Sequence, residues 1–199
     1  MRQRGLRVNI VNLKQRILSA ARECFRAGGV DGVSMRRVAQ RVGVSATAIY
    51  RYYRDKDELL EAVTEEGFAR FEEYLRRAAG ATPLERLRSI VLAYVDFAID
   101  HPNHYDFIFV AARANTRQFP RDFDERRSVT FELVREQVAE GMECGQLAPD
   151  DAPEATLTIW ATLHGFAALY LAGRFGTDDQ RFRDLSCRAI ERLLSGMAA

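Results

Sequence analysis

The chain has 199 residues, of which 47% are hydrophobic and 29% are charged. That composition is typical of an ordinary globular protein and argues against wholesale disorder. The three cysteines are widely spaced and form no CxxC pair, which argues against a disulfide framework and a cysteine-based zinc site. No basic-then-apolar leader opens the chain, so we expect a cytoplasmic protein.

The formal net charge of +1 hides an uneven distribution. Residues 1–56 hold 13 Lys or Arg and three acidic residues, a net charge of +10. The remaining residues hold 16 basic and 25 acidic side chains, a net charge of −9. A basic N-terminal region suggests a polyanionic partner, although a run of charge is also common on a plain solvated surface.

Apolar residues recur with helical spacing from the start of the chain. In the first predicted helix they form one stripe, Leu13, Ile17, Ala21, Cys24 and Phe25, and Gly28-Gly29 ends it. Two short helices follow, over residues 34–41 and 45–53. Longer helices are predicted over residues 55–80, 82–101, 121–144, 151–173 and 178–197, with a short helical segment over 103–113 and a loop over 114–120.

These elements predict an all-α protein of about nine helices. Residues 10–56 form a three-helix head that contains a helix-turn-helix over residues 34–53. Residues 57–199 form a larger helical body. The sequence has no internal repeat and no low-complexity segment.

The helix-turn-helix is predicted from a small set of residues between the two short helices. Val38, Ala39 and Val42 form the apolar face of its first helix. Gly43 suits a tight turn that needs a permissive backbone. Ser45 can accept hydrogen bonds from the amides that open the second helix.

A helical wheel divides the second short helix into two faces. The inward face carries Ala46, Ile49 and Tyr53. The opposite face carries Thr47, Ala48 and Arg51, with Tyr50 and Tyr52 on the flanks. Methyl, hydroxyl and guanidinium groups on one outer face suit the major groove of DNA. Arg36 and Lys56 stand where they can reach a base or a phosphate.

Plainer interpretations remain open. A G-x-S sequence between two short helices forms many tight corners, and tyrosines at helical spacing usually belong to a core. We expect Tyr53 in the core, and we expect Tyr50 at the surface beside the basic residues Arg51, Arg54 and Lys56.

Residues 13–63 read LKQRILSAARECFRAGGVDGVSMRRVAQRVGVSATAIYRYYRDKDELLEAV. This segment resembles the DNA-binding domain of TetR-family transcriptional regulators along its whole length. The resemblance implies a homodimer that binds palindromic operator DNA through two heads and represses transcription until a small ligand enters the body.

Carried over by position, the resemblance and the helical wheel give a set of expected DNA contacts. They are Arg36, Ser45, Ala46, Thr47, Ala48, Tyr50, Arg51, Tyr52 and Lys56. Two positions depart from the commonest family pattern. Ala48 stands where threonine or serine is common, and Tyr52 stands where histidine is frequent.

Residues 157–175 are apolar nearly all round, which predicts burial on more than one side. The stretch is about long enough to span a membrane, but it is single, carries polar residues and lies in an acidic body. We therefore expect no membrane span and instead an intersubunit four-helix bundle with the last helix. Its expected interface residues are Ala161, Gly165, Ala168, Ala172, Leu185, Ala189 and Leu193.

The spacing W-x-x-x-H-G at Trp160–Gly165, with the upstream segment 101–109, resembles a body subtype within the TetR family. Aromatic and histidine residues of the middle helices are candidates for an apolar ligand pocket with a few polar groups. They are Phe68, Phe71, Tyr94, Phe97, His101, Tyr105, Phe109, Phe131, Trp160 and His164. The same residues can equally form a solid core, with His164 as a structural histidine between helices.

No Gly-rich phosphate loop, G-x-S-x-G or H-E-x-x-H motif occurs in the chain, so we expect neither an enzyme nor a bound cofactor. His101, His104 and Asp106 lack the spacing of a metal site, and we predict no metal. The sequence thus predicts a homodimeric repressor that a small apolar or amphipathic ligand releases from DNA. The alternative is a DNA-binding regulator without a small-molecule input.

Overall fold

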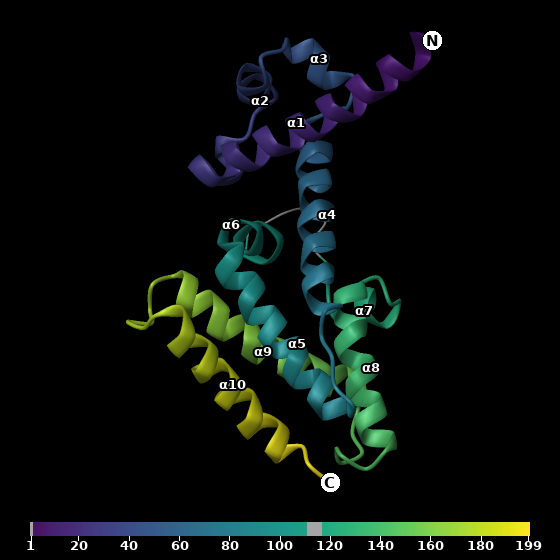
Figure 1. Cartoon of the computed structure of the whole chain (residues 1–199), viewed down its shortest axis with the longest axis vertical. Helices are drawn as coiled ribbons and strands as arrows, with labels where there is room; N and C mark the ends of the chain where they lie inside the picture. The colour runs from purple at the N-terminus through teal and green to yellow at the C-terminus, as the bar shows by residue number, and fades with distance from the viewer. Residues whose placement is uncertain (1, 111–116) are drawn as a thin grey trace. The chain divides into compact units, whose positions relative to one another are not determined.

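The computed structural model describes the backbone of residues 2–110 and 117–199 and the side chains of residues 13–109 and 117–199 (Figure 1). Within this range the chain forms α-helices and no β-strand, which confirms the predicted all-α class. The helices are α1 Arg2–Gly32, α2 Met35–Val42, α3 Ala46–Tyr50, α4 Lys56–Leu75, α5 Pro83–Asp100, α6 Pro102–Tyr105, α7 Arg121–Asp124, α8 Val129–Glu143, α9 Ala152–Leu171 and α10 Asp179–Gly196. A π-helical segment, η1 Asp106–Val110, directly continues α6.

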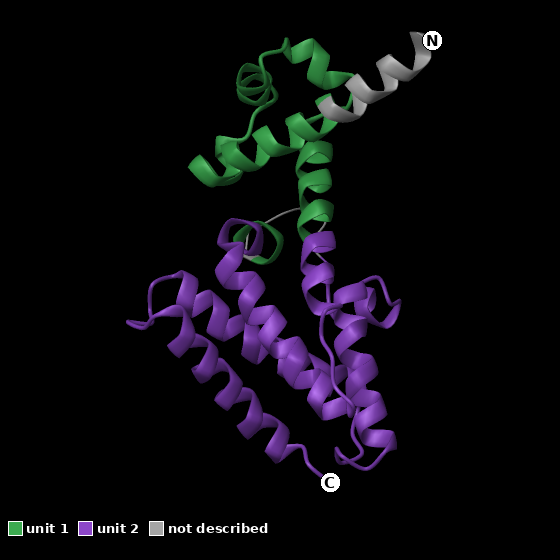
Figure 2. Cartoon of the chain, in the orientation of Figure 1, with its two compact units in different colours: residues 1–67, 106–111 green, residues 68–105, 112–199 purple. Residues whose placement is uncertain are grey.

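The chain divides into two compact units (Figure 2). The head unit comprises residues 1–67 and 106–111, and the body unit comprises residues 68–105 and 112–199. Helix α4 belongs to both units, because the division falls within it at Phe68. In the head unit α1 packs on α2 and α2 packs on α3.

One helix of the body differs from its prediction. The helix expected over residues 121–144 is two helices, α7 and α8, separated at residues 125–128. Arg126 adopts a left-handed backbone with φ of 55°, and the Ser128 hydroxyl accepts a hydrogen bond from Phe131 N at 3.4 Å. A capping serine begins a new helix here, because it satisfies an amide that would otherwise lack a partner.

The corner before α8 is held by a buried carboxylate. Asp122 is 4% exposed, and its Oδ2 accepts hydrogen bonds from the Gln118 backbone N–H and from Arg121, both at 2.8 Å. Arg127 reaches Oδ1 at 3.2 Å. The hydrogen bonds from Arg121 and Gln118 lower the pKa of Asp122 to about 2, so the carboxylate stays ionised at neutral pH.

Three other helix limits differ from expectation. Helix α3 ends at Tyr50, and α4 ends at Leu75 well before Gly80. Gly80 lies so close to α5 that an added Cβ would lie 2.6 Å from Cβ of Glu85, so the chain has already left the helix there. The segment predicted over residues 103–113 is α6 and η1 as far as Val110; residues 111–113, and residues 114–116 of the predicted loop, lie outside the described part.

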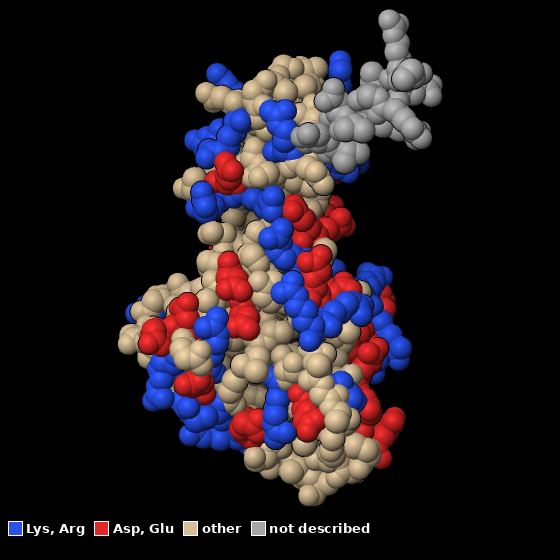
Figure 3. All heavy atoms as spheres, viewed as in Figure 1, with Lys and Arg blue, Asp and Glu red and all other residues tan. Residues whose placement is uncertain are grey.

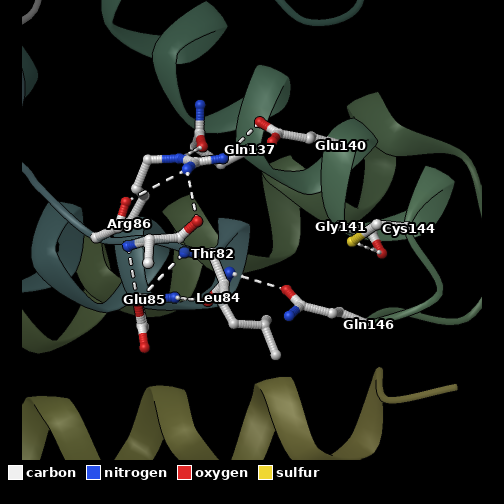
Figure 4. Close-up of polar contacts among 11 residues, drawn as sticks. Thr82, Leu84, Glu85, Arg86, Gln137, Glu140, Gly141, Cys144 and Gln146 are labelled. Atoms are coloured by element: carbon white, nitrogen blue, oxygen red, sulfur yellow. Dashed lines mark hydrogen bonds and ion pairs between the residues drawn. The ribbon is translucent and has the colours of Figure 1, made fainter.

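A hydrogen bond and an ion pair connect the first turn of α5 to α8 (Figure 4). Thr82 and Glu85 form the reciprocal capping box that opens α5, where the sequence predicted a helix start. Arg86 donates to the side-chain oxygen of Gln137 and pairs with Glu140 at 2.6 Å. Gln146, beyond α8, accepts from Leu84 N at 3.4 Å. These contacts fix the position of α5 within the body unit.

Helix α5 is the central helix of the body unit, since it packs against α8, α9 and α10. Its buried side chains, Leu87, Ile90, Val91, Tyr94, Val95, Phe97 and Ala98, form much of the core. Two ion pairs bind it to α10, Arg88 with Glu191 and Arg183 with Asp96. Among the described helices none, α9 included, combines the length and hydropathy needed to cross a bilayer.

Candidate DNA interface

The turn between α2 and α3 is set by short-range hydrogen bonds. Ser34 caps α2 by accepting from Arg37 N at 3.2 Å. At the end of α2, Gly43 adopts a left-handed backbone with φ of 77°, and its N–H donates to Ala39 O at 2.9 Å. Ser45 then caps α3 by accepting from Ala48 N at 3.2 Å. The roles predicted for Gly43 and Ser45 are confirmed.

A tight apolar core holds the three head helices together. Val38, Ala39 and Val42 of α2 are buried, and so are Ile49 of α3 and the predicted stripe of α1 from Ile17 to Phe25. Small Ala39, 2% exposed, allows the close approach of the helices. Arg16 donates to Val42 O at 2.7 Å, which satisfies a carbonyl at the end of α2.

The outer face of α3 is formed by Thr47, Tyr50 and Arg51. All three are exposed, and the Tyr50 side chain is 53% exposed. Ala48, Ala46 and Tyr52 are half-buried, so Ala48 is less exposed than its outward position on the wheel indicated. Helix α3 ends at Tyr50, whereas the wheel assumed a regular helix to residue 53.

Tyr53 is a core residue, as predicted. It is 3% exposed, and burial, followed by the charges of Glu66 and Glu58, raises its pKa to about 12. The hydroxyl is therefore protonated at neutral pH. Lys14 lies over the ring at 5.7 Å from its centroid.

Five of the ten cations within residues 13–56 have a hydrogen-bond or ion-pair partner in the described chain. These are Arg16 on Val42 O, Arg22 on Glu66, Arg37 on Gly32 O, Arg41 on Glu23, and Arg54 on Asp55 and Glu58. Within residues 13–56, four other cations, Arg26, Arg36, Arg51 and Lys56, have no hydrogen bond or ion pair from their side chains to the rest of the described chain. Figure 3 shows Lys and Arg side chains gathered on the displayed face of the head unit. The unpaired cations are the ones available to phosphates without breaking a contact.

Lys56 is the first residue of α4, and the start of that helix is capped. Asp55 Oδ1 accepts from Glu58 N at 2.8 Å, and Glu58 Oε2 accepts from Arg54 N at 2.6 Å. The predicted capping pair is therefore present, although Glu58 takes the amide of Arg54 rather than that of Asp55. This arrangement places Lys56 in the first turn of α4, six residues after the end of α3.

In the body unit, three candidate ligand residues converge on one point. The Tyr105 hydroxyl lies 2.7 Å from His164 Nδ1 and 3.1 Å from the Tyr94 hydroxyl. Tyr94 also lies 3.4 Å from Nδ1. Trp160 and Tyr105 stack on the His164 ring, with ring centroids 5.5 Å and 5.6 Å away. Burial lowers the pKa of His164 and raises those of Tyr94 and Tyr105, so all three are neutral at pH 7.

The other candidate ligand residues differ in their contacts. Phe71 and Phe97 are buried and their ring centroids lie 4.9 Å apart. His101 joins them through Phe97, at 5.5 Å. Phe131 is buried against Phe123, and Phe68 carries Arg117 over its ring at 4.6 Å. Phe109 belongs to the head unit, so the structure does not bring it together with the rest in one unit.

Two comparisons with known proteins agree on the family of the chain. Residues 17–63 match the family described as "Bacterial regulatory proteins, tetR family". Residues 87–193 match the domain described as "Tetracyclin repressor-like, C-terminal domain". The chain belongs to the TetR family. It is a DNA-binding helix-turn-helix regulator of transcription and not an enzyme.

Individual relatives of this TetR-family protein match it over most of its length or over a part of it. It is 26% identical over 169 residues to the HTH-type transcriptional repressor AcnR of Corynebacterium efficiens, which covers 82% of this chain and 84% of the relative. Over 80 residues, 39% of this chain and 36% of the relative, it is 38% identical to the repressor KstR of Mycobacterium tuberculosis. A solved structure of a protein with unknown function from Rhodococcus sp. RHA1 superimposes with a TM-score of 0.75 at 27% identity and covers 94% of this chain and 96% of that one.

The predicted dimer residues of this TetR-family chain lie on two helices. On α9, Ala161 and Gly165 are exposed and Ala168 is half-buried, and Ala172, which directly follows α9, is exposed. On α10, Leu185, Ala189 and Leu193 are half-buried. The opposite side of α9, from Ala155 to Ala167, faces the core.

Sequence reasoning missed two residues. Arg26 is an unpaired cation near the end of α1, and its lack of a partner is visible only in the folded head unit. The Tyr74 hydroxyl lies 3.1 Å from His101 Nε2 and 3.0 Å from Asp100 Oδ2. In the sequence, its helical spacing from Phe71 could have identified it as a neighbour of the aromatic residues. His101 and His104 contact edge to face, and among the described residues no group of three His, Cys, Asp or Glu is placed to hold a metal ion.

Proposed function

We propose that this regulator is a homodimeric repressor that binds palindromic operator DNA through its two copies of α3. The observation that supports this most is the exposed face of Thr47, Tyr50 and Arg51 beside unpaired Arg36 and Lys56. Relatives named as repressors, AcnR and KstR, support repression as the mode of regulation. Such a protein acts on the chromosome in the bacterial cytoplasm.

The DNA contacts divide into two kinds. Arg36, Arg51 and Lys56 supply positive charge, which positions the protein on phosphates and carries most of the salt dependence. Ser45, Thr47 and Tyr50 supply the exposed groups that can meet base edges in the major groove. Ala46, Ala48 and Tyr52 are half-buried and complete the contact surface from the flanks.

The test of this function is a fluorescence-anisotropy titration with the DNA upstream of its own gene, at several salt concentrations, beside a scrambled duplex. Lys56→Ala removes one phosphate contact per half-site, so we expect weaker binding to both duplexes and a salt slope smaller by about one per half-site. Tyr50→Ala should weaken only specific binding, by about 1–3 kcal/mol per half-site. Wild-type salt slope and affinity in both variants would show that the DNA face lies elsewhere.

The dimer is proposed to form through α9 and α10. The outer side of α9 carries exposed Ala161, Gly165 and Ala172 together with Leu169, which is 50% exposed. A Cβ added at Gly165 would meet no atom within 4 Å beyond its chain neighbours and the local backbone of α9. Small and apolar side chains on an exposed helix face suit close packing against the same face of a second subunit.

Two leucines of similar exposure test the interface. Leu169→Arg places a charge in the proposed bundle, so we expect sedimentation to show monomer at concentrations where the wild type is a dimer. Leu92, on α5, is 42% exposed, and Leu92→Arg is the control that should stay dimeric. Gly165→Leu should also dissociate the dimer without disturbing the fold of the subunit. A dimeric Leu169→Arg would remove α9 from the interface.

Release from DNA is proposed to follow binding of a small apolar or amphipathic ligand in the body unit. Phe71, Phe97 and Trp160 would meet its apolar part, and Tyr94, Tyr105 and His164 its polar end. Helix α4 is shared by both units, so a ligand that displaces it changes the position of the two recognition helices. Only a ligand with different affinities for the two states can act in this way.

The alternative is a regulator that responds to a protein partner or binds constitutively. A thermal-shift screen with apolar and amphipathic compounds separates the two. A compound that raises Tm and lowers operator affinity supports ligand release. A compound that saturates the body while operator affinity stays constant would contradict it.

A further inference from the structure

The outer face of α3 lacks the side chains that read adenine and cytosine directly. Residues 44–52 contain no Asn, Gln, Asp or Glu. Reading adenine by two hydrogen bonds takes an amide side chain, and a carboxylate is the group that accepts from the cytosine amino group. The nearest amide side chain in the sequence is that of Gln40, on α2. The first helix of a helix-turn-helix crosses the DNA backbone rather than entering the groove, so we do not expect Gln40 to read bases.

What α3 does present is apolar surface with hydroxyl groups. Thr47 offers a methyl group and Tyr50, 53% exposed, offers a ring. Ala48 adds a second methyl, half-buried on the flank. The thymine C5-methyl is the apolar group on the floor of the major groove, and threonine methyls and aromatic rings contact it. Thr47 and Ser45 hydroxyls can bond either donors or acceptors and so discriminate weakly.

We propose that this protein reads its operator half-site through thymine methyl groups, with Thr47 and Tyr50 as the specificity-determining residues. The inference rests on the proposed DNA-binding function and names the base chemistry of its target. Arg51 and Arg36 lie outside this readout, as phosphate contacts or as donors to guanine O6 and N7.

The experiment uses deoxyuridine, which pairs as thymine does but lacks the methyl. Bound duplexes are selected from a random 30-base-pair library, and each thymine of the selected half-site is then replaced by deoxyuridine in one of the two half-sites, so that a single methyl is removed. Burial of one methyl is worth about fourfold in affinity. We expect about fourfold weaker binding for each contacted thymine, measured by anisotropy at fixed salt, and no change at uncontacted thymines.

Two substitutions at one position assign the contact. Thr47→Ser keeps the hydroxyl and removes the methyl, and Thr47→Val keeps the methyl and removes the hydroxyl. The readout is the ratio of Kd on uracil DNA to Kd on thymine DNA. We expect Thr47→Ser to bring this ratio close to one at its thymine and Thr47→Val to leave it at about four. Gln40→Ala is the control and should leave the base preference unchanged.

Each outcome decides the inference. Specific binding that tolerates uracil at every position, or a selected half-site without thymine, would overturn it and leave the DNA-binding function intact. A base preference lost in Gln40→Ala and kept in the Thr47 variants would transfer the readout to α2 and also overturn it. Absence of binding to any selected duplex at every salt concentration would overturn both the function and the inference.

Discussion

The recognition turn of the head unit and the aromatic cluster of the body unit are specified by contacts of very different range. In the head, the bonds that set the recognition turn join residues three or four apart, such as Ser45 to Ala48 and Gly43 to Ala39. In the body, the Tyr105 and Tyr94 hydroxyls reach His164 across 59 and 70 residues. The DNA-binding element is therefore built from local rules, whereas the aromatic cluster exists only once α5, α6 and α9 are packed.

This difference fits the two tasks proposed for the units. A recognition helix must present the same face each time it meets DNA, and caps with a left-handed glycine fix it within one short segment. A site that answers to a ligand benefits from groups on several helices, because binding can then shift those helices together. The single tryptophan, Trp160, stacks on His164, so its emission reports on the body unit alone.

The largest expected effect tests the long-range cluster. Tyr105→Phe deletes one oxygen of a fully buried side chain and so removes the 2.7 Å bond to His164 and the 3.1 Å bond to Tyr94. We expect the free energy of unfolding of the body to fall by about 1–3 kcal/mol, measured by Trp160 emission in urea. Tyr50→Phe, at an exposed site, is the control and should unfold as the wild type does. An unchanged midpoint in Tyr105→Phe would show that the cluster is not a structural element.

The same contrast explains what the sequence could predict. Helix starts followed from capping residues, and Thr82, Asp151 and Asp178 each cap a helix where expected. The break between α7 and α8 was missed because residues 125–128 carry no glycine or proline. Its causes are the burial of Asp122 and the left-handed Arg126, and neither follows from periodicity.

The candidate sites, too, could be predicted from the sequence only in part. Residue types and spacing were enough to expect Tyr50 at the surface and Tyr53 in the core, and both are confirmed. The ion pairs of Arg22, Arg41 and Arg54 in the head could not be predicted. Arg41 meets Glu23 across 18 residues, and only the packing of α1 on α2 determines that distance. Likewise, residue types and spacing could not rank the ten candidate ligand residues, of which Tyr94, Tyr105 and His164 share hydrogen bonds.

A smaller effect tests the local rules of the head. Gly43 has φ of +77°, and an added Cβ would meet nothing within 4 Å. The cost of Gly43→Ala is therefore backbone strain alone, about 1–2 kcal/mol. We expect lower hydrogen-exchange protection of head amides, with the Trp160 transition in urea unchanged. Gly43→Asn should lose less, because asparagine tolerates this backbone better. A Trp160 midpoint that moves with Gly43→Ala would show that the two units unfold together.

The smallest expected effect is a pH dependence confined to the body. Burial lowers the pKa of His164, and burial and the charge of Arg70 lower the pKa of His101, against an opposing effect of Asp100. In the unfolded chain both histidines titrate near a pKa of about 6.5. The unfolded state therefore binds protons first on acidification, and the stability present above about pH 6.5 declines as the pH falls toward the lower folded pKa values.

We expect the free energy of unfolding, followed by Trp160 emission in urea, to fall between about pH 7 and pH 5. His164→Gln and His101→Gln should each make that decline shallower, and together they should nearly remove it. Tyr94 and Tyr105, whose pKa values are raised by burial, stay protonated throughout this range. Asp122, with a pKa of about 2, stays ionised. If the free energy of unfolding of the double variant falls with pH as steeply as that of the wild type, other groups cause the pH dependence. Protonation of the two histidines would then not affect stability.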